Sequence, residues 1–121
     1  MILVDTSVWI RHFRFSDPDL IQLLEDRAVL VHPIVVGELA CGNLPRRAEV
    51  LGSLRKLPPA PRASDGEALG FIERHRLMGR GINYSDVHLL ASAVLAGDAR
   101  LWTTDVRLER AAARLFVSYS P

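Results

Sequence analysis

Cysteine is almost absent from this sequence, since Cys41 is the only one among 121 residues. An internal disulfide is therefore excluded, which fits a reducing cytosol. Long hydrophobic runs are also missing: residues 29–31 and 34–36 form runs far shorter than the roughly 20 residues that span a bilayer. The opening residues contain neither a positively charged leader nor an apolar stretch of signal-peptide length. We therefore expect a soluble, cytoplasmic protein that does not associate with membranes.

Lysine is equally scarce, because Lys56 is the only one and every other cationic side chain, histidine aside, is arginine. An arginine side chain binds phosphate oxygens with two donors, whereas a lysine side chain acts as a point charge. Two explanations of this bias stay open: selection for phosphate binding, and a GC-rich genome that favours arginine codons. The net charge of +1 does not separate them.

Signatures of several other enzyme classes are missing. The sequence contains no glycine-rich phosphate loop and no nucleophile elbow. Cys41 has no evident partner base, so we do not expect a thiol nucleophile. No two of the four histidines are spaced i, i+4 as metal ligands on a helix would be. His88 is expected to pack in the core or to help close a helix start rather than to catalyse.

The pattern of apolar residues predicts one α/β domain covering residues 1–121. Strands alternate with helices, which is typical of a parallel sheet with helices on both faces. Thr6 and Ser7 are expected to cap the first helix, and Ser85 the helix that follows residue 85. The expected strands are residues 2–4, 29–31, 101–103 and 115–117. The expected helices are residues 8–13, 18–24, 34–40, 45–54, 65–76, 86–95 and 106–114.

Acidic residues occur where these elements meet one end of the predicted sheet. Asp5 ends the first strand, and Asp105 follows the strand at 101–103. Asp86 begins a helix, and Glu38 lies in the helix after the second strand among apolar neighbours, where a solvated glutamate is less expected. Ligands of open α/β sheets bind outside the carboxyl ends of the strands. The four acids are therefore expected to meet there.

Four carboxylates that lie close together repel one another unless a cation neutralises them. Mg²⁺ or Mn²⁺ prefers such oxygen ligands, and either ion can promote phosphodiester hydrolysis. Each aspartate also has a simpler explanation. Asp5 is compatible with a turn residue, Asp86 with a first-turn carboxylate favoured by the helix dipole, and Asp105 with a helix cap.

Four segments of the sequence carry a family resemblance. They are residues 2–9 (ILVDTSVW), 36–39 (VGEL), 84–91 (YSDVHLLA) and 101–105 (LWTTD). Together and in this order they resemble a PIN-domain ribonuclease, in particular the VapC-type toxin of a toxin–antitoxin pair. The resemblance implies a three-layer sandwich around a central parallel sheet of about four to five strands.

The resemblance also implies an activity and its partners. It implies a Mg²⁺- or Mn²⁺-dependent endoribonuclease that cuts structured RNA, with tRNA or rRNA as the usual substrates, and a homodimer silenced by a cognate antitoxin. It implies that the metal is held by Asp5, Glu38, Asp86 and Asp105, supported by Thr6, Ser7 and Thr103. Relatives often carry a basic residue where this sequence has Thr104, and another where it has Val106, so an RNA contact at those places is in doubt.

Two interaction surfaces follow as hypotheses. Arg74, Arg76 and Arg80, beside two mobile glycines, are candidates for RNA phosphate contacts, with a solvated helix end as the alternative. An apolar stripe near Trp9 is the candidate antitoxin surface, with burial in the core as the alternative. The stripe consists of Ile34, Val35, Leu39 and Ala40.

Two other functions compete with the ribonuclease hypothesis. A phosphorylatable receiver domain would have similar length and topology, but it needs an acceptor aspartate after a mid-chain strand and a late lysine, and Lys56 is wrongly placed. A PIN-like module that binds RNA or protein without cutting would be expected to lack one of the acids, and all four are present.

Overall fold

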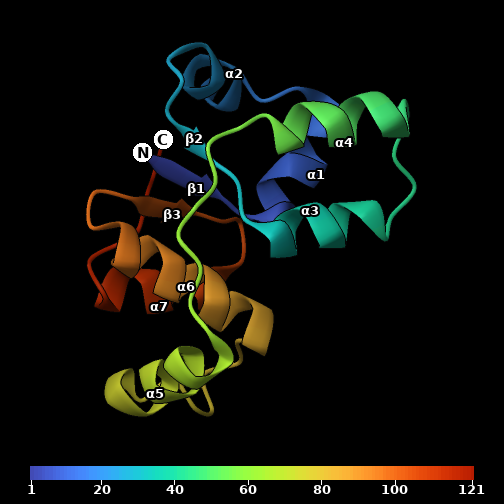
Figure 1. Ribbon diagram of the computed structural model, residues 1–121. Coiled ribbons are helices and arrows are strands. Elements are labelled where there is room, and N and C mark those ends of the chain that lie inside the picture. The colour runs from blue at the N-terminus through green and yellow to red at the C-terminus, as the bar shows by residue number, and fades with distance from the viewer.

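Three short parallel strands form the centre of the fold in the computed structural model, which describes residues 1–121 (Figure 1). They are β1 (Ile2–Val4), β2 (Val29–Leu30) and β3 (Arg100–Trp102), in the spatial order β2-β1-β3. The central strand β1 pairs through Leu3 with Leu30 on one side and with Leu101 on the other. All three β1 residues are buried, as the unbroken apolar run predicts for a strand covered on both faces.

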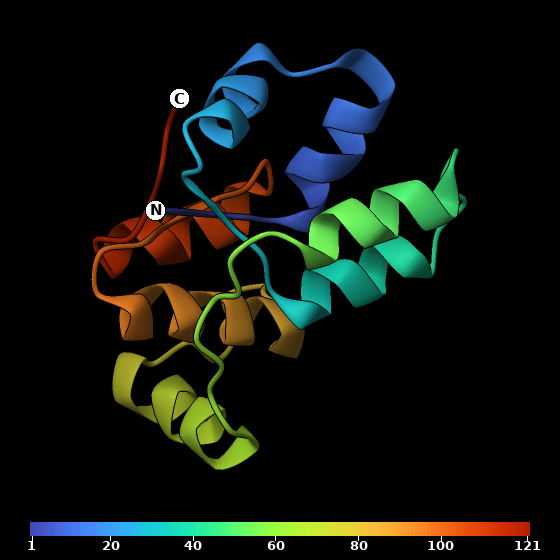
Figure 2. The same cartoon turned by 45° about the horizontal axis from the view of Figure 1, so that its top comes forward.

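Seven helices surround this sheet. Figures 1 and 2 show α3 and α4 as a pair on the side away from the two chain termini, and α5 as an outer layer beyond α6. Both α6 and α7 pack against β3, and α1 packs against α3. The helices are α1 (Thr6–Phe15), α2 (Pro18–Glu25), α3 (Pro33–Ala40), α4 (Arg47–Arg55), α5 (Asp65–His75), α6 (Tyr84–Ala96) and α7 (Val106–Arg114).

The prediction of an α/β fold with a helix-covered parallel sheet is confirmed, but the expected number of strands is too high. The expected strand at 115–117 is wrong, because the end of α7 turns there: Phe116 has a left-handed φ of 60°, and Val117 donates to the Ala112 carbonyl. Only an isolated bridge joins Ser118 to Leu101 at the edge of the sheet. The chain thus returns to the sheet too late and too briefly to add a strand.

Two predicted helix caps are also wrong. Helix α1 begins at Thr6, so Asp5 takes the cap position, and Thr6 and Ser7 lie in the first turn. Helix α6 begins at Tyr84, before Ser85, and its cap is Asn83. In both cases the helix starts earlier than predicted, and the hydroxyl groups become available for other contacts.

Helix α6 runs through the interior, with an almost continuous buried segment from Val87 to Ala93. This burial fixes the orientation of its first turn relative to the sheet. The longest helix has 13 residues, and none of the helices is both long enough and apolar enough to cross a bilayer.

Candidate active site

Asp5 is the most deeply buried acid of the molecule, with 7% of its surface exposed. It leaves the end of β1 with its backbone N–H donating to the Trp102 carbonyl. Its Oδ2 accepts hydrogen bonds from Ser7 Oγ and from Thr103 Oγ1, each at 2.8 Å. Both bonds fall on one oxygen, so Oδ1 is left without a hydrogen bond from the protein. Two hydroxyl groups thus hold the carboxylate while half of it stays available.

Asp105 lies at the same edge of the sheet, just beyond β3. It caps α7: its Oδ1 accepts from the backbone N–H groups of Arg107 and Leu108 at 2.8 and 3.2 Å. Its own N–H donates to Thr103 Oγ1 at 3.0 Å. The buried Thr103 hydroxyl therefore links the backbone of one acid to the side chain of another, Asp5.

Glu38 and Asp86 come from α3 and α6. Glu38 is exposed, and its Oε1 accepts a hydrogen bond from Thr6 Oγ1 at 2.7 Å, which ties α3 to the first turn of α1. Asp86 forms a reciprocal cap with Asn83: its N–H donates to Asn83 Oδ1, and its Oδ2 accepts from the Asn83 N–H. Each acid again uses one oxygen for the fold and leaves the other free of protein hydrogen bonds.

The four acids lie close enough to act on one another electrostatically. Burial raises the pKa of Asp86 above its ordinary value, the backbone N–H of Asn83 partly opposes this, and the charges of Asp5, Asp105 and Glu38 raise that pKa further. No three Asp, Glu, His or Cys side chains are close enough together to form a finished coordination sphere. The arrangement is thus a convergence of acids at one edge of the sheet rather than a closed cage.

Comparison with known proteins agrees with this geometry. A family model described as the PIN domain matches residues 2–114, which include all four acids. The chain belongs to the PIN domain family. It is 48% identical over 113 residues to Ribonuclease VapC32 of Mycobacterium tuberculosis strain CDC 1551 / Oshkosh, and equally to Ribonuclease VapC32 of strain ATCC 25618 / H37Rv. Each alignment covers 93% of this chain and 91% of the relative. The resemblance to VapC-type PIN-domain ribonucleases is thereby confirmed.

The hydroxyl residues of this PIN domain act differently from simple helix caps. Thr6 holds Glu38, Ser7 and Thr103 hold Asp5, and the Thr104 N–H donates to Ser7 Oγ at 3.1 Å. The three residues expected to support the site therefore all contact an acid. Asp5 occupies the cap position of α1 but makes no side-chain cap hydrogen bond. The simpler explanations of Asp86 and Asp105 do hold, because Asp86 lies in the first turn of α6 and closes a capping box with Asn83, and Asp105 caps α7. One oxygen of each side chain suffices for that task.

The arginines predicted to contact RNA lie elsewhere on the PIN domain, at the end of α5. Arg74, Arg76 and Arg80 are all exposed. Arg76 ends the helix in a left-handed conformation, and Arg80 Nε donates to its carbonyl at 2.8 Å. No hydrogen bond or ion pair joins any of them to the four acids, so their contact with RNA stays a prediction.

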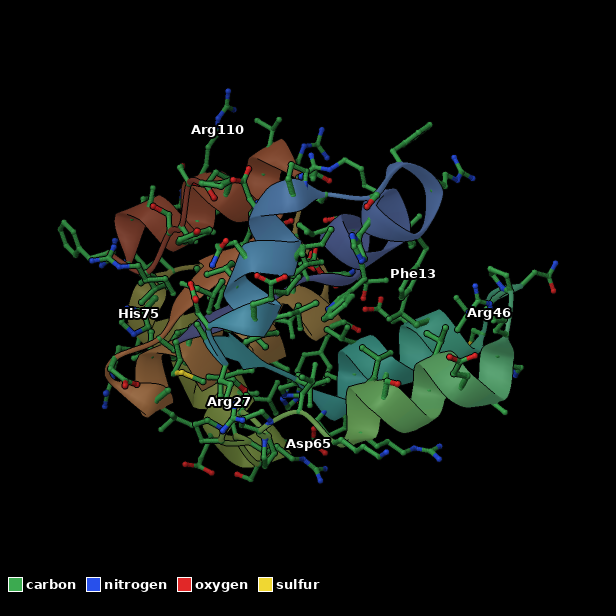
Figure 3. All side chains as sticks on the ribbon, turned by 90° about the horizontal axis from the view of Figure 1, so that it is seen from above. Phe13, Arg27, Arg46, Asp65, His75 and Arg110 are labelled. Carbon is green, nitrogen blue, oxygen red and sulfur yellow. The ribbon has the colours of Figure 1, made fainter.

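The apolar surface predicted for the antitoxin is only partly available. Val35 and Leu39 are buried in the core, as the alternative explanation anticipated. Trp9 instead lines a cavity of about 330 Å³ between α1, α2 and α4, together with Phe13 and Arg46, which are labelled in Figure 3. Trp9 is only 3% exposed, and its buried Nε1–H has no hydrogen-bond partner.

A histidine that has no part in the sequence-based hypotheses forms the N-cap of α3. His32 is 2% exposed, and its Nδ1 accepts a hydrogen bond from the Ile34 N–H at 3.0 Å. Burial, followed by electrostatic interaction with His88 and with the Arg62 guanidinium group, lowers the pKa of His32 to about 4, so the ring is neutral at pH 7. Its Nε2 has no partner. A His-Pro pair before an apolar helix was the only sequence signal of this role.

Proposed function

We propose that this chain is a metal-dependent endoribonuclease that cuts structured RNA, as the toxin of a toxin–antitoxin pair. The observation that carries the proposal is the set of four carboxylates at the carboxyl edge of the sheet, each with one oxygen free of protein hydrogen bonds. The name of the similar Mycobacterium tuberculosis protein, Ribonuclease VapC32, supports the reaction.

The acids fit a hard divalent cation by the chemistry of their donor atoms, because Mg²⁺ and Mn²⁺ prefer carboxylate oxygens. Asp5, Glu38, Asp86 and Asp105 would hold the ion, and neither histidine nor cysteine competes at this place. When bound, such an ion polarises a phosphoryl oxygen and lowers the pKa of a coordinated water. It would also relieve the repulsion that raises the pKa of Asp86.

The protein's own contribution is to hold the acids in place. The hydroxyl groups of Ser7 and Thr103 fix one oxygen of Asp5, and helix starts fix Asp86 and Asp105. Ser7 and Asp86 lie in the first turns of helices, and Asp5, Thr103 and Asp105 directly adjoin a strand or a helix. This placement keeps a phosphate-binding arrangement rigid before the substrate arrives. The oxygens that accept no hydrogen bond from the protein are then available to balance charge during cleavage.

The partners of the proposed toxin follow from the same family relationship. We expect an antitoxin to insert an apolar segment into the cavity beside Trp9, with a backbone carbonyl accepting from the unpartnered Nε1–H. An arginine of the same partner would pair with the free carboxylate oxygens. We also expect a homodimer and a cytoplasmic location.

The test is RNA cleavage by purified protein in Mg²⁺ or Mn²⁺, with and without an excess of chelator. We expect cleavage to need the ion and Asp5→Asn to lower the rate at least about a hundredfold, the scale of removing a key catalytic group. Asp98→Asn alters an exposed acid whose carboxylate makes no hydrogen bond or ion pair, so it is the control and should leave the rate unchanged. Undiminished cleavage in chelator would refute the metal dependence. RNA binding without any cleavage would identify a silent binding module instead.

A further inference from the structure

A second polar pocket lies beside the acids, between the starts of α3, α5 and α6. It is a cavity of about 390 Å³, and its polar lining is His32, Arg62, Ser64, Asp65, Tyr84 and His88. Helices α3 and α5 both begin there, with His32 and Ser64 as their N-caps. Free N–H groups and a positive dipole end make helix starts favourable for anions.

His32 supplies a donor that the protein itself does not use. Because Nδ1 accepts from the Ile34 N–H, the neutral ring carries its proton on Nε2. This N–H has no partner although the residue is 98% buried. An unpaired buried donor costs stability, so a ligand that supplies an acceptor would recover that loss.

The other polar groups of the pocket are donors, apart from Asp65, whose Oδ1 is paired and whose Oδ2 accepts no hydrogen bond. The exposed Arg62 has no carboxylate within ion-pair distance, and its charge acts on His32. The one carboxylate, Asp65, accepts from Tyr84 Oη at 2.6 Å and lies 3.5 Å from His88 Nε2. The unused capacity is therefore a guanidinium group and an imidazole N–H, which suit a ligand with several acceptor oxygens.

We propose that this pocket binds a phosphate group of the RNA substrate, next along the strand from the phosphate that is cut. The proposal rests on the proposed ribonuclease function. The pocket shares the helices α3 and α6 with the acids. Pro33 and Glu38 lie about 7.5 Å apart along α3 at 1.5 Å per residue, and Asp86 and His88 lie about 3 Å apart along the axis of α6, on different sides of that helix. An RNA strand bound at both places would have its register fixed relative to the cutting site.

Two variants test the contribution of the pocket to activity while leaving the four acids unchanged. Arg62→Gln removes the charge and keeps hydrogen-bonding capacity, whereas His32→Asn keeps an acceptor for the Ile34 N–H and removes the Nε2–H. Arg55→Gln, on the exposed side of α4, is the matched control. We expect each pocket variant to raise KM about tenfold with little change in kcat, because the lost contact stabilises the bound substrate and the transition state equally. Thermal melting identifies any variant that fails for lack of folding.

The decisive experiment uses RNA in which one phosphate at a time is replaced by a neutral methylphosphonate. Binding is measured to cleavage-deficient Asp5→Asn protein with and without Arg62→Gln. We expect one linkage, adjacent to the cut site, whose neutralisation weakens binding about tenfold with Arg62 and has no effect without it. If Arg62→Gln reduced the effect of neutralisation equally at every linkage, the proposal would be overturned. Such a result would indicate only a general attraction between Arg62 and the RNA backbone.

An experiment with inorganic phosphate distinguishes a site for an RNA phosphate group from a site for free phosphate. Its addition should shift the His32 ring signals in NMR spectra of the wild-type protein and not of Arg62→Gln. Phosphate binding with unaltered RNA affinity in Arg62→Gln would overturn the RNA assignment and leave a site for free phosphate. If the wild-type protein binds RNA with the expected linkage dependence and yet cuts none, the proposed nuclease function fails while the pocket stands. If the protein cuts RNA but binding does not depend on one linkage, the pocket proposal fails while the nuclease function stands.

Discussion

At the scale of single residues, each of the four acids uses one carboxylate oxygen for hydrogen bonds within the protein and leaves the other oxygen without one. Asp105 shows this most directly, because Oδ1 caps α7 and Oδ2 accepts no hydrogen bond. A cap contributes about 1 kcal/mol to stability. A substitution that keeps one carbonyl oxygen should therefore preserve the fold and remove only the charge.

Asp86→Asn tests this division. Asparagine keeps an oxygen that can accept from the Asn83 N–H. It also removes a carboxylate whose ionised form is disfavoured by burial and by the charges of Asp5, Asp105 and Glu38. We expect the metal-free variant to unfold at the same or a higher temperature than the wild type at pH 7. Added Mg²⁺ should raise the melting temperature of the wild type and raise that of the variant less.

Asp98→Asn again serves as the control for this prediction. Its carboxylate is exposed and makes no hydrogen bond or ion pair, so its melting temperature should respond to Mg²⁺ as the wild type does. An equal loss of the Mg²⁺ response in both variants would show that Asp86 is not a ligand.

His32 makes the stability of the protein depend on pH in one direction. Its pKa is about 4 in the folded state against an ordinary value of 6.5, so between these values the unfolded chain binds a proton that the folded protein does not. Stability should therefore fall as the pH is lowered from 6.5 to 4, by up to about 1.4 kcal/mol per pH unit. Urea denaturation at a series of pH values measures the slope.

The variant His32→Asn isolates this contribution from other titrating groups. It has no ionisable side chain at residue 32, so its stability should decline less steeply than that of the wild type over the same pH interval. Parallel curves would mean that the buried ring is not the group responsible. Above pH 6.5 the difference in free energy of unfolding between the two proteins should be constant.

At the scale of structural elements, two glycines in the connection from α5 to α6 differ in their surroundings. Both have left-handed φ angles, 71° at Gly79 and 76° at Gly81. A Cβ at Gly79 would meet nothing within 4 Å, whereas one at Gly81 would lie 2.5 Å from Arg107 Cδ. The connection thus packs its backbone directly against the first turn of α7.

We expect Gly79→Ala to cost about 1 kcal/mol from backbone strain alone. Gly81→Ala should cost more, and Arg107→Ala should remove the difference by making room for the methyl group. A double-mutant cycle measured by chemical denaturation gives this interaction energy. If Arg107→Ala changed the cost of both substitutions equally, the contact between Gly81 and Arg107 would be unimportant.

The elements also show what the sequence pattern predicted and what it did not. Seven helices and the three paired strands were located from apolar periodicity and Pro or Gly boundaries. Two helix starts were misplaced because more than one nearby polar residue could cap: Asn83 outcompetes Ser85, since its amide forms a reciprocal pair with Asp86. The fourth strand was wrong because the left-handed turn at Phe116, a residue without a special backbone preference, cannot be recognised from periodicity.

At the scale of the whole molecule, RNA binding should respond to salt according to the number of phosphates contacted. Arg76 and Arg80 form an exposed basic end on α5. If they contact RNA, Arg76→Gln with Arg80→Gln should weaken binding to all sequences and lower the slope of log affinity against log salt by about 0.7 per contact on a single strand. Fluorescence anisotropy at several salt concentrations gives the slope.

Arg55→Gln controls for the loss of net charge in this experiment, because Arg55 lies on α4 rather than α5. It should leave the slope unchanged. The same slope in the double variant as in the wild type would favour the solvated helix end that was the alternative for these arginines.

The candidate site shows how far residue patterns alone reach on this scale. Three of the four acids were proposed because each follows a strand or opens a helix at the same edge of the sheet, and Glu38 was proposed because it lies among apolar residues in a helix that follows a strand. The pocket at His32 and Arg62 was not predicted, because its members come from segments with no shared motif and meet only through the packing of α3, α5 and α6. The buried Trp9 Nε1–H was hidden for the same reason.

The order of the strands has a consequence for synthesis of the chain. The central strand β1 is made first, but its neighbour β3 pairs Arg100 with Ile2, and the hydrogen bond that holds Asp5 reaches across 98 positions to Thr103. Such non-local pairings close late, after most of the chain has left the ribosome. Asp5 therefore gains its partner only when nearly all of the polypeptide exists. A nascent chain on the ribosome therefore cannot yet bring Asp5 and Asp105 together at the edge of the sheet.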